Sequence, residues 1–184
     1  MNKKYIKDYE IDYTGKKPRP VYKGPLYYFE MEPGGLKNAK IFLLTNSLLS
    51  ACLFVLMSFA GDKAVRIYYV GIPYMFLIVP AFYSCVDATK FLMRDKPMER
   101  MHYEGSFMHL ISWAFASMIF SGAAIIGDII FLIKSESLPL FEFFFTPLAA
   151  LLFLSSFVSL RKTLKLKACV KEIPPVLPDA GQGE

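Results

Sequence analysis

The sequence predicts an all-α integral membrane protein in which four transmembrane helices form two helical hairpins. Two observations support this fold class. Four apolar stretches are long enough to cross a hydrocarbon core of about 30 Å as helices, which takes about 20 residues each. Lysine and arginine are also distributed unevenly among the segments that connect these stretches. Because 54% of its residues are apolar, the chain is not an intrinsically disordered protein.

The predicted spans are Ile41–Ala60, Ile67–Val86, Phe107–Ile133 and Leu138–Leu160. The first two contain no charged residue, and Pro73 and Pro80 interrupt the second. Within a membrane bundle, neighbouring groups satisfy the carbonyls that a proline frees, so these prolines predict a kinked helix. A buried helix of a soluble protein would show a polar face at a period of 3.6 residues. The first span offers only Thr45, Asn46 and a few serines.

The basic residues predict the orientation of the spans. Of the 21 lysines and arginines, 18 lie before the first span, between the second and third, or after the fourth. Only Lys63, Arg66 and Lys134 lie in the other two loops. Because positive charge is retained on the cytoplasmic side, both termini are predicted to be cytoplasmic, and the plasma membrane is the expected location. The first apolar run begins at Ile41, so no removable signal sequence is expected.

The composition outside the spans predicts the domain organisation. Residues 1–40 form a cytoplasmic segment rich in tyrosine and lysine, where glycines and prolines separate short alternating stretches. This pattern predicts an irregular or β-hairpin-like segment that lies against lipid headgroups or docks on a partner. Residues 41–167 form the membrane domain. Residues 168–184 contain three prolines and two glycines and are predicted to be a disordered cytoplasmic tail.

Asp128 and Glu142 are the two acidic residues within the predicted spans. An antiparallel hairpin places them at nearly the same depth, on either side of the turn at Lys134–Ser137. A carboxylate in a membrane is costly, so such residues are candidates for a functional site. Two interpretations stay open. The pair could share a proton or hold a cation, or each carboxylate could form salt bridges near the outer headgroups with the basic residues of the outer loops.

Four basic side chains near the start of the third span are candidates for contact with a partner or with lipid headgroups: Arg94, Arg100, His102 and His109. The two histidines have no cysteine pair nearby and no HExxH arrangement, so their spacing is not typical of a metal site. Neither a metal nor a cofactor is expected. The three cysteines lie within the spans or on the cytoplasmic side, and no disulfide is expected.

The amino acids of two spans predict their packing. Ser112, Ala116, Ala123 and Gly127 recur in the third span at spacings of four or seven, and small residues let helices approach closely in lipid. The third helix is therefore expected to be central. The second span is bulky and aromatic and is expected to face lipid or a partner.

The sequence contains no nucleophile elbow, phosphate-binding loop, dinucleotide fingerprint or paired-cysteine motif. Its charged inner surface comprises residues 1–40 and the loop Asp87–Ser106. These features predict a non-enzymatic accessory or scaffolding subunit. Its expected partners are anionic headgroups of the bilayer and a membrane protein or a second copy of the chain. No nucleic-acid partner is expected, because the excess charge lies where the positive-inside rule places it.

Two alternative functions stay open. The first is a small transporter or channel component that uses Asp128 and Glu142. The second is a lipid-modifying membrane enzyme that would use the dense polar cluster at headgroup depth. The members of that cluster are Asp87, Arg94, Asp95, Arg100, His102 and Glu104.

Overall fold

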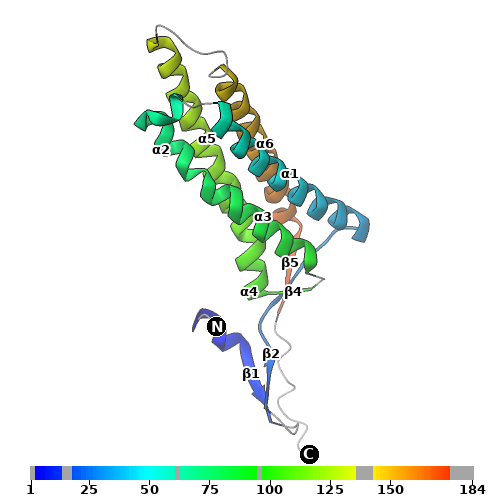
Figure 1. Ribbon diagram of the computed structural model, residues 1–184. Helices are drawn as coiled ribbons and strands as arrows, with labels where there is room; N and C mark the ends of the chain where they lie inside the picture. Colours follow the sequence, from blue (N-terminus) through cyan, green and yellow to red (C-terminus); the bar gives the residue numbers. More distant parts are fainter. Residues whose placement is uncertain (1–2, 14–17, 61–62, 95–96, 136–142, 175–184) are drawn as a thin grey trace, which may run out of the picture.

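The computed structural model describes residues 3–13, 18–60, 63–94, 97–135 and 143–174, and most of these residues are helical. Four long helical spans lie side by side (Figure 1). They are α1 (Pro33–Ala60), α2 (Tyr68–Phe76) with α3 (Ile78–Met93), α5 (His109–Lys134) and α6 (Phe145–Ala168). Each span is long and apolar enough to cross a membrane. The predicted fold class of four apolar helices packed in pairs is confirmed.

The helices extend beyond the predicted spans at one end of the bundle. α1 begins at Pro33 instead of Ile41, and α6 continues to Ala168 instead of Leu160. The added turns are rich in lysine, which has a high helix propensity, so the helix continues where the apolar stretch ends. These lysine-rich turns and the strands lie at the same end of the bundle, which we call the basic end. We call the other end the opposite end.

The predicted kink in the second span is confirmed. α2 ends at Phe76 and α3 begins at Ile78, with Leu77 between them. Pro80 lies in the first turn of α3, where a backbone N–H would have no helical acceptor in any case. Pro73 lies inside α2 and removes the N–H that would reach the carbonyl of Tyr69 four residues earlier.

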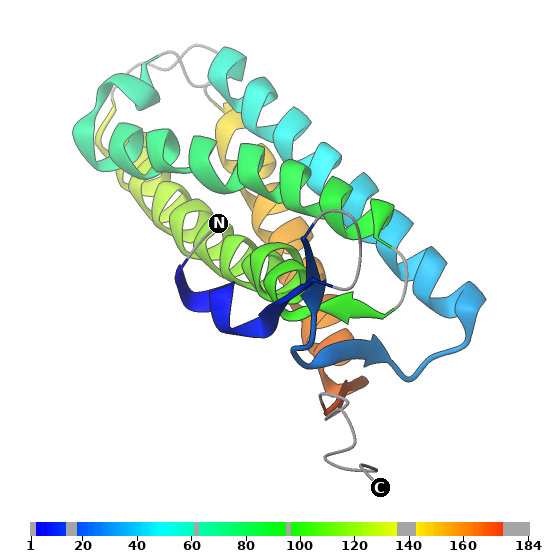
Figure 2. The same cartoon turned by 90° about the horizontal axis from the view of Figure 1, so that it is seen from below.

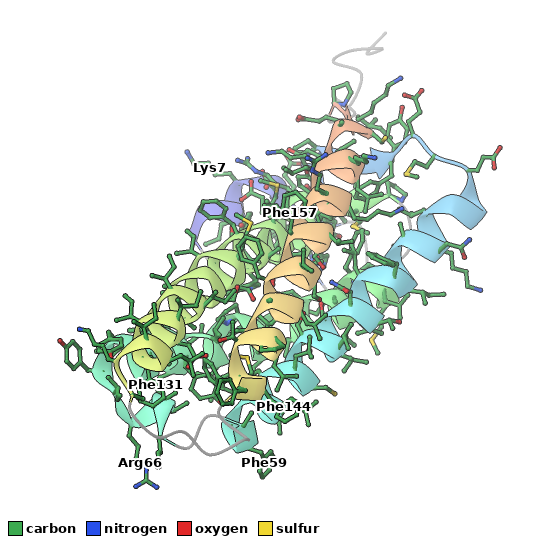
Figure 3. The ribbon with its side chains drawn as sticks, turned by 90° about the horizontal axis from the view of Figure 1, so that it is seen from above. Lys7, Phe59, Arg66, Phe131, Phe144 and Phe157 are labelled. Atoms are coloured by element: carbon green, nitrogen blue, oxygen red, sulfur yellow. The ribbon has the colours of Figure 1, made fainter. Side chains whose placement is uncertain are left out.

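The two hairpins pack into a four-helix bundle. α1 packs against α3 and α6. α5 packs against α6 and against both helices of the second span, α2 and α3. The outer faces of the bundle are apolar, and Phe59, which is 76% exposed, projects away from it (Figure 3). Several polar side chains, including Asp87 and Asp128, are buried inside. Apolar surfaces around a partly polar interior suit a lipid environment.

Two apolar clusters fill the bundle at different heights. The cluster at the opposite end includes Met57, Tyr74, Phe131, Phe145 and Leu152. The cluster at the basic end includes Leu43, Phe91, Phe107, Leu110 and Leu166, and Phe29 from the N-terminal segment joins it. Phe29 packs edge-on against Phe91 and Phe107 at ring-centre distances of 5.6 and 5.2 Å. The N-terminal segment is therefore anchored in the core of the bundle.

Two small sheets cover the basic end (Figure 2). β1 (Tyr9–Asp12) and β2 (Arg19–Tyr22) form an antiparallel pair, as the N-terminal pattern predicts. The second sheet has the order β4–β3–β5, with β3 (Leu26–Phe29) between β4 (Met98–Glu99) and β5 (Val170–Ile173). Both neighbours of β3 are antiparallel to it. The sheet thus joins segments from the start, middle and end of the chain.

The prediction of a disordered tail over residues 168–184 is wrong for its first part. β5 pairs with β3 along its whole length, from Val170 opposite Phe29 to Ile173 opposite Leu26. β3 supplies backbone partners that no local sequence pattern reveals, and these offset the entropy of ordering the chain. The part from residue 175 onward lies outside the described residues.

Candidate functional site

A layer of polar side chains crosses the bundle between the two apolar clusters, and we call it the hydroxyl layer. Its members are Asn46, Ser47 and Ser50 of α1, Ser84 of α3, Ser117 and Ser121 of α5, and Ser155, Ser156 and Ser159 of α6. Along each span, these residues lie between a residue of the cluster at the basic end and a residue of the cluster at the opposite end. Every long span therefore contributes a polar group at mid-height, where burial without a hydrogen bond is costly.

Hydrogen bonds of the hydroxyl layer join α1 to α6. The Asn46 side chain donates to the Ser155 carbonyl at 2.9 Å and to the Ser159 hydroxyl at 2.6 Å. The Ser155 hydroxyl donates back to Asn46 Oδ1 at 3.1 Å and lies 2.9 Å from the Ser50 hydroxyl. Asn46 thereby uses both the nitrogen and the oxygen of its side-chain amide, and these bonds fix the position of α1 along α6.

A second set of hydrogen bonds joins α5 to α6. The Ser156 hydroxyl donates to the Ser117 hydroxyl at 2.8 Å, and both residues are buried. The Ser121 hydroxyl donates to the Ser117 carbonyl of its own helix at 2.7 Å. Together with Asn46, these bonds make α6 the helix through which the polar groups of α1 and α5 are connected.

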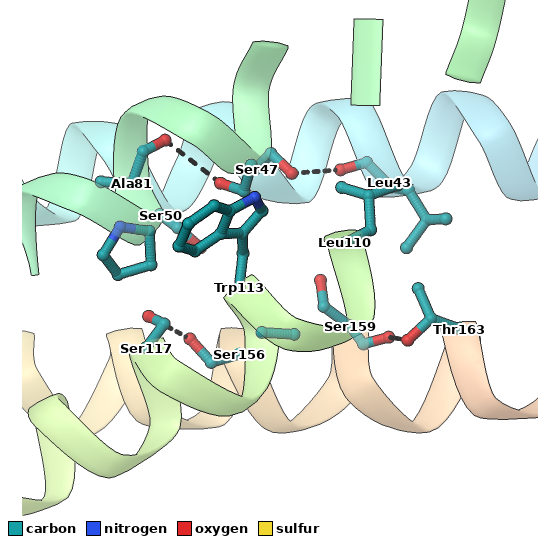
Figure 4. A pocket seen from close by; sticks show the side chains of 13 residues that line it. Leu43, Ser47, Ser50, Ala81, Leu110, Trp113, Ser117, Ser156, Ser159 and Thr163 are labelled. Atoms are coloured by element: carbon teal, nitrogen blue, oxygen red, sulfur yellow. Dashed lines mark hydrogen bonds between the residues drawn. The ribbon is translucent and has the colours of Figure 1, made fainter. Parts of the chain in front are cut away.

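A small cavity lies beside the hydroxyl layer (Figure 4). Its volume is about 30 Å³, and its wall includes Ser47, Ser50, Ser84, Ser117, Ser156, Ser159 and Thr163. A polar cavity holds one water per roughly 10–15 Å³ of such volume, so about two waters fit here. The cavity is far smaller than the roughly 300–1,000 Å³ of a typical small-molecule pocket. Water is therefore the size of ligand that this cavity can take.

The indole of Trp113 connects the cavity to a buried carboxylate. Trp113 projects into the space between the hydroxyl groups (Figure 4), and its Nε1 donates to Asp87 Oδ2 of α3 at 2.9 Å. Asp87 is 2% exposed. The other carboxylate oxygen, Oδ1, accepts from Lys90 Nζ at 3.1 Å, and His109 Nδ1 lies 3.6 Å from Oδ2. A buried carboxylate is thus surrounded by donors from α3 and α5, as a buried charge requires.

Asp128 lies inside the bundle toward its opposite end. Its side chain is fully buried, and the hydroxyl of Thr146 in α6 donates to its Oδ2. Glu142, which the sequence pairs with Asp128, lies outside the described residues. Trp113, Ser117, Ser121 and Asp128 recur along α5 at spacings of four or seven, so they form one stripe along its inner face.

The four basic candidates have three different environments. Arg94 and His102 line the same pocket at the basic end. Arg100 Nε donates to Glu104 Oε1 at 2.9 Å on its own helical turn. His109 faces Asp87. The structure therefore does not bring all four together.

Tyrosines of the N-terminal segment dock on residues 99–104. The Tyr9 hydroxyl donates to Glu99 Oε2 at 2.7 Å, and the Tyr5 hydroxyl donates to Glu104 Oε2 at 3.0 Å. The backbone N–H of Arg100 donates to the Tyr22 hydroxyl at 3.0 Å. These contacts join the segment to its own chain, and its docking on headgroups or on a partner stays a prediction.

These contacts change the titration of the tyrosines. The hydrogen bond to Glu99, together with burial, raises the pKa of Tyr9 to about 12, because a phenolate would lose the bond and be repelled by the carboxylate. Burial raises the pKa of Tyr22 and of Tyr27. On the second sheet, the hydrogen bond with Glu30 raises the pKa of Lys171, whose Nζ lies 2.7 Å from Glu30 Oε1.

The sequence pattern revealed only part of this site. The sequence indicates that Asp87 belongs to a charged loop, but its burial beside Trp113 depends on the contact between α3 and α5. The small serines of α5 predict close packing, and in the structure they also contribute hydroxyl groups to the layer. Asn46 can be recognised from the sequence as a contact residue, because a lone amide in the middle of an apolar span requires a hydrogen-bond partner.

Among the described residues, no three His, Cys, Asp or Glu side chains form a group that could hold a metal ion. Comparisons with models of protein families, with curated proteins and with solved structures find no match to this chain.

Proposed function

We propose that this chain is an integral protein of the plasma membrane, with its basic end and both termini in the cytoplasm. The apolar outer faces of the four spans support insertion, and the basic residues gathered at one end support this orientation. Cysteine accessibility in intact cells tests it, with Lys7→Cys and Ser135→Cys placed one at a time in a chain without native cysteines. An impermeant reagent should label position 135 alone. Labelling of position 7 alone would reverse the orientation.

We further propose that the chain is a non-enzymatic accessory subunit that docks a membrane-protein partner through its cytoplasmic cap. The cap comprises η1 (Lys3–Asp8), the two sheets and the segment 97–104. One observation carries this proposal: the cap is a folded surface anchored in the bundle, yet Ile6, Ile11 and Val21 are 51%, 56% and 42% exposed on it. Exposed apolar side chains among charged neighbours are typical of interaction surfaces.

Affinity purification in a mild detergent tests the docking proposal. The double variant Ile11→Asp, Val21→Asp places one charge on each face of the β1–β2 pair, because Ile11 is opposite Pro20 and Val21 is opposite Glu10, and it should lose the partner. Two conservative substitutions of exposed residues on α5, Ile119→Val and Ile129→Val, serve as the control and should retain the partner. The proposal fails if the wild-type chain elutes alone, if it elutes only as a homo-oligomer, or if the charged variant retains its partner.

A transporter or channel component is the second candidate, and the buried stripe on α5 favours it. Asp128 lies near one end of the stripe, and Trp113 with its partner Asp87 lies at the other, with hydroxyl groups between them. A buried acid joined to hydroxyl groups is the kind of arrangement that relays protons in membrane proteins. The small cavity excludes larger solutes in this conformation.

Proton flux into liposomes that contain the purified chain tests this candidate. Asp128→Asn, alone and combined with Glu142→Gln, should abolish flux, while Ser112→Ala on an exposed face of α5 should leave it unchanged. Flux at the wild-type rate in the double variant would remove the candidate.

A further inference from the structure

A pocket at the basic end has a cationic wall and is separate from the hydroxyl layer. Its volume is about 280 Å³, and its lining residues are Lys90, Arg94, Met101, His102, Gly105 and Ser106. Lys90 lies in the last turn of α3, and Arg94 directly follows the last residue of that helix. The others belong to α4 (Arg100–His102) and to the π-helical turn η3 (Tyr103–Met108) that follows it. The pocket thus lies between the second and third spans.

The two basic side chains of this pocket, Lys90 and Arg94, are accessible to a ligand. Lys90 Nζ lies 3.1 Å from Asp87 Oδ1, yet the Lys90 side chain is 58% exposed. An ammonium group has three donors, so one can hold Asp87 while others remain for a ligand. Arg94 is exposed, and its guanidinium is suited to an anion with several oxygens because its donors form a planar fork.

The backbone leaves space beside these cations. In the π-helical turn Tyr103–Met108, a Cβ built on Gly105 would meet no atom within 4 Å. π-helical turns inside α-helices are frequent at functional sites. Ser106 lines the same space, although its hydroxyl donates to the His102 carbonyl at 2.5 Å.

The pocket lies where the apolar outer surface of α3 meets the charged basic end. Val86 and Met93 are 47% and 76% exposed on α3, and Arg94 follows Met93 directly. A molecule in the pocket can therefore have its anionic part beside Lys90 and Arg94 while an apolar part continues along the lipid-facing side of α3.

We propose that this pocket binds the phosphate of an anionic phospholipid in the leaflet that faces the basic end. The phosphate is recognised by two cations at the C-terminal end of α3, by a histidine that can donate, and by the open space at a glycine. The adjoining apolar surface of α3 selects a lipid over a free phosphate. The site requires insertion of the chain into a membrane but does not require that the chain act as an accessory subunit.

Native mass spectrometry of the full chain in a mild detergent tests this site, with phosphatidylglycerol and phosphatidylcholine as probes. The wild-type chain should retain phosphatidylglycerol in preference to phosphatidylcholine. Arg94→Gln should weaken phosphatidylglycerol binding about fivefold, the effect of removing one cation beside an anionic lipid. Arg161→Gln is the matched control, because Arg161 lies near the basic end of α6 against the Phe157 ring and outside the pocket, and it should leave binding unchanged.

Gly105→Leu provides a second variant that keeps every charge and fills the open space, and it should also weaken binding. Circular dichroism checks whether each variant is folded. If Arg94→Gln does not fold, lipid binding by Gly105→Leu tests the proposal. Competition with inorganic phosphate and with glycerol 3-phosphate separates a lipid site from a free-phosphate site. The proposal is overturned if Arg94→Gln and Arg161→Gln bind alike, if Gly105→Leu binds as the wild type does, or if inorganic phosphate displaces the lipid.

Discussion

Gly127 of α5 lies so close to α2 that a Cβ built on it would stand 2.6 Å from the backbone carbonyl oxygen of Tyr69. That carbonyl has no helical donor four residues later, because residue 73 is proline. The proline and the glycine therefore act together: one frees a carbonyl, and the other lets α5 approach it. Weak contacts between Cα–H groups and carbonyls recur at such close helix interfaces.

Gly127→Ala should destabilise the bundle by about 1–3 kcal/mol, the usual cost of overpacking, because the atom in its way belongs to the backbone. Gly122→Ala on the same helix is the matched control. Its Cβ would stand 3.6 Å from the Phe153 ring, an ordinary contact, so stability should stay the same or rise by up to about 1 kcal/mol. Unfolding in mixed detergent micelles, followed by circular dichroism, measures both. Equal effects of the two substitutions would contradict this account of the α2–α5 contact.

The hydrogen bond from Trp113 to Asp87 should appear as an energetic coupling between the two residues. Trp113→Phe and Asp87→Asn, alone and together, form a double-mutant cycle in micelles. Polar contacts between membrane helices are worth about 0.6–2 kcal/mol, and a coupling of that size is expected here. Because Trp113 is the only tryptophan in the chain, Asp87→Asn should also shift its fluorescence emission. Additive effects together with unchanged emission would show that the contact is absent.

Asn46→Ala should loosen α1 from α6, since the Asn46 amide is the shared partner of Ser155 and Ser159. A loss of about 1–2 kcal/mol in unfolding free energy is expected. Ser112→Ala is the control, because Ser112 is exposed and its hydroxyl donates to the Met108 carbonyl of its own helix. If Ser112→Ala destabilises the chain as much as Asn46→Ala, the amide does not join the two helices.

The Tyr9–Glu99 contact should make docking of the N-terminal hairpin sensitive to alkaline pH. The folded chain raises the pKa of Tyr9 from 10.0 to about 12, so its neutral form is favoured in the docked state. This contribution to stability is complete below pH 10 and is lost as the pH rises through about 12. The titration is followed by near-ultraviolet absorbance in the wild type and in Tyr9→Phe. The difference between the two curves should show a tyrosine that ionises at about pH 12.

Glu99→Gln should lower the pKa of Tyr9, since the carboxylate both accepts a hydrogen bond from the neutral phenol and repels the phenolate. A Tyr9 transition that does not respond to Glu99→Gln would place the cause of the shift elsewhere.

The amino-acid sequence by itself determined the number of spans, the kink at the two prolines and the basic end. Each of these follows from properties of consecutive residues: the length of an apolar run, a missing N–H and the count of positive charges. The sequence also predicted strands in residues 1–40, because alternating side chains between glycines and prolines are a local signal.

Only the tertiary structure decided which polar residues meet. Asn46 and Ser155 are 109 positions apart, and Asp87 and Trp113 are on different spans. Asp128 was paired in the sequence with Glu142, but the described α6 begins at Phe145, and Thr146 is the residue that reaches Asp128. β5 formed where a tail was predicted because β3 was available to pair with it. A polar group inside an apolar span must find a donor or acceptor, but many partners satisfy it about equally, so helix packing makes the choice.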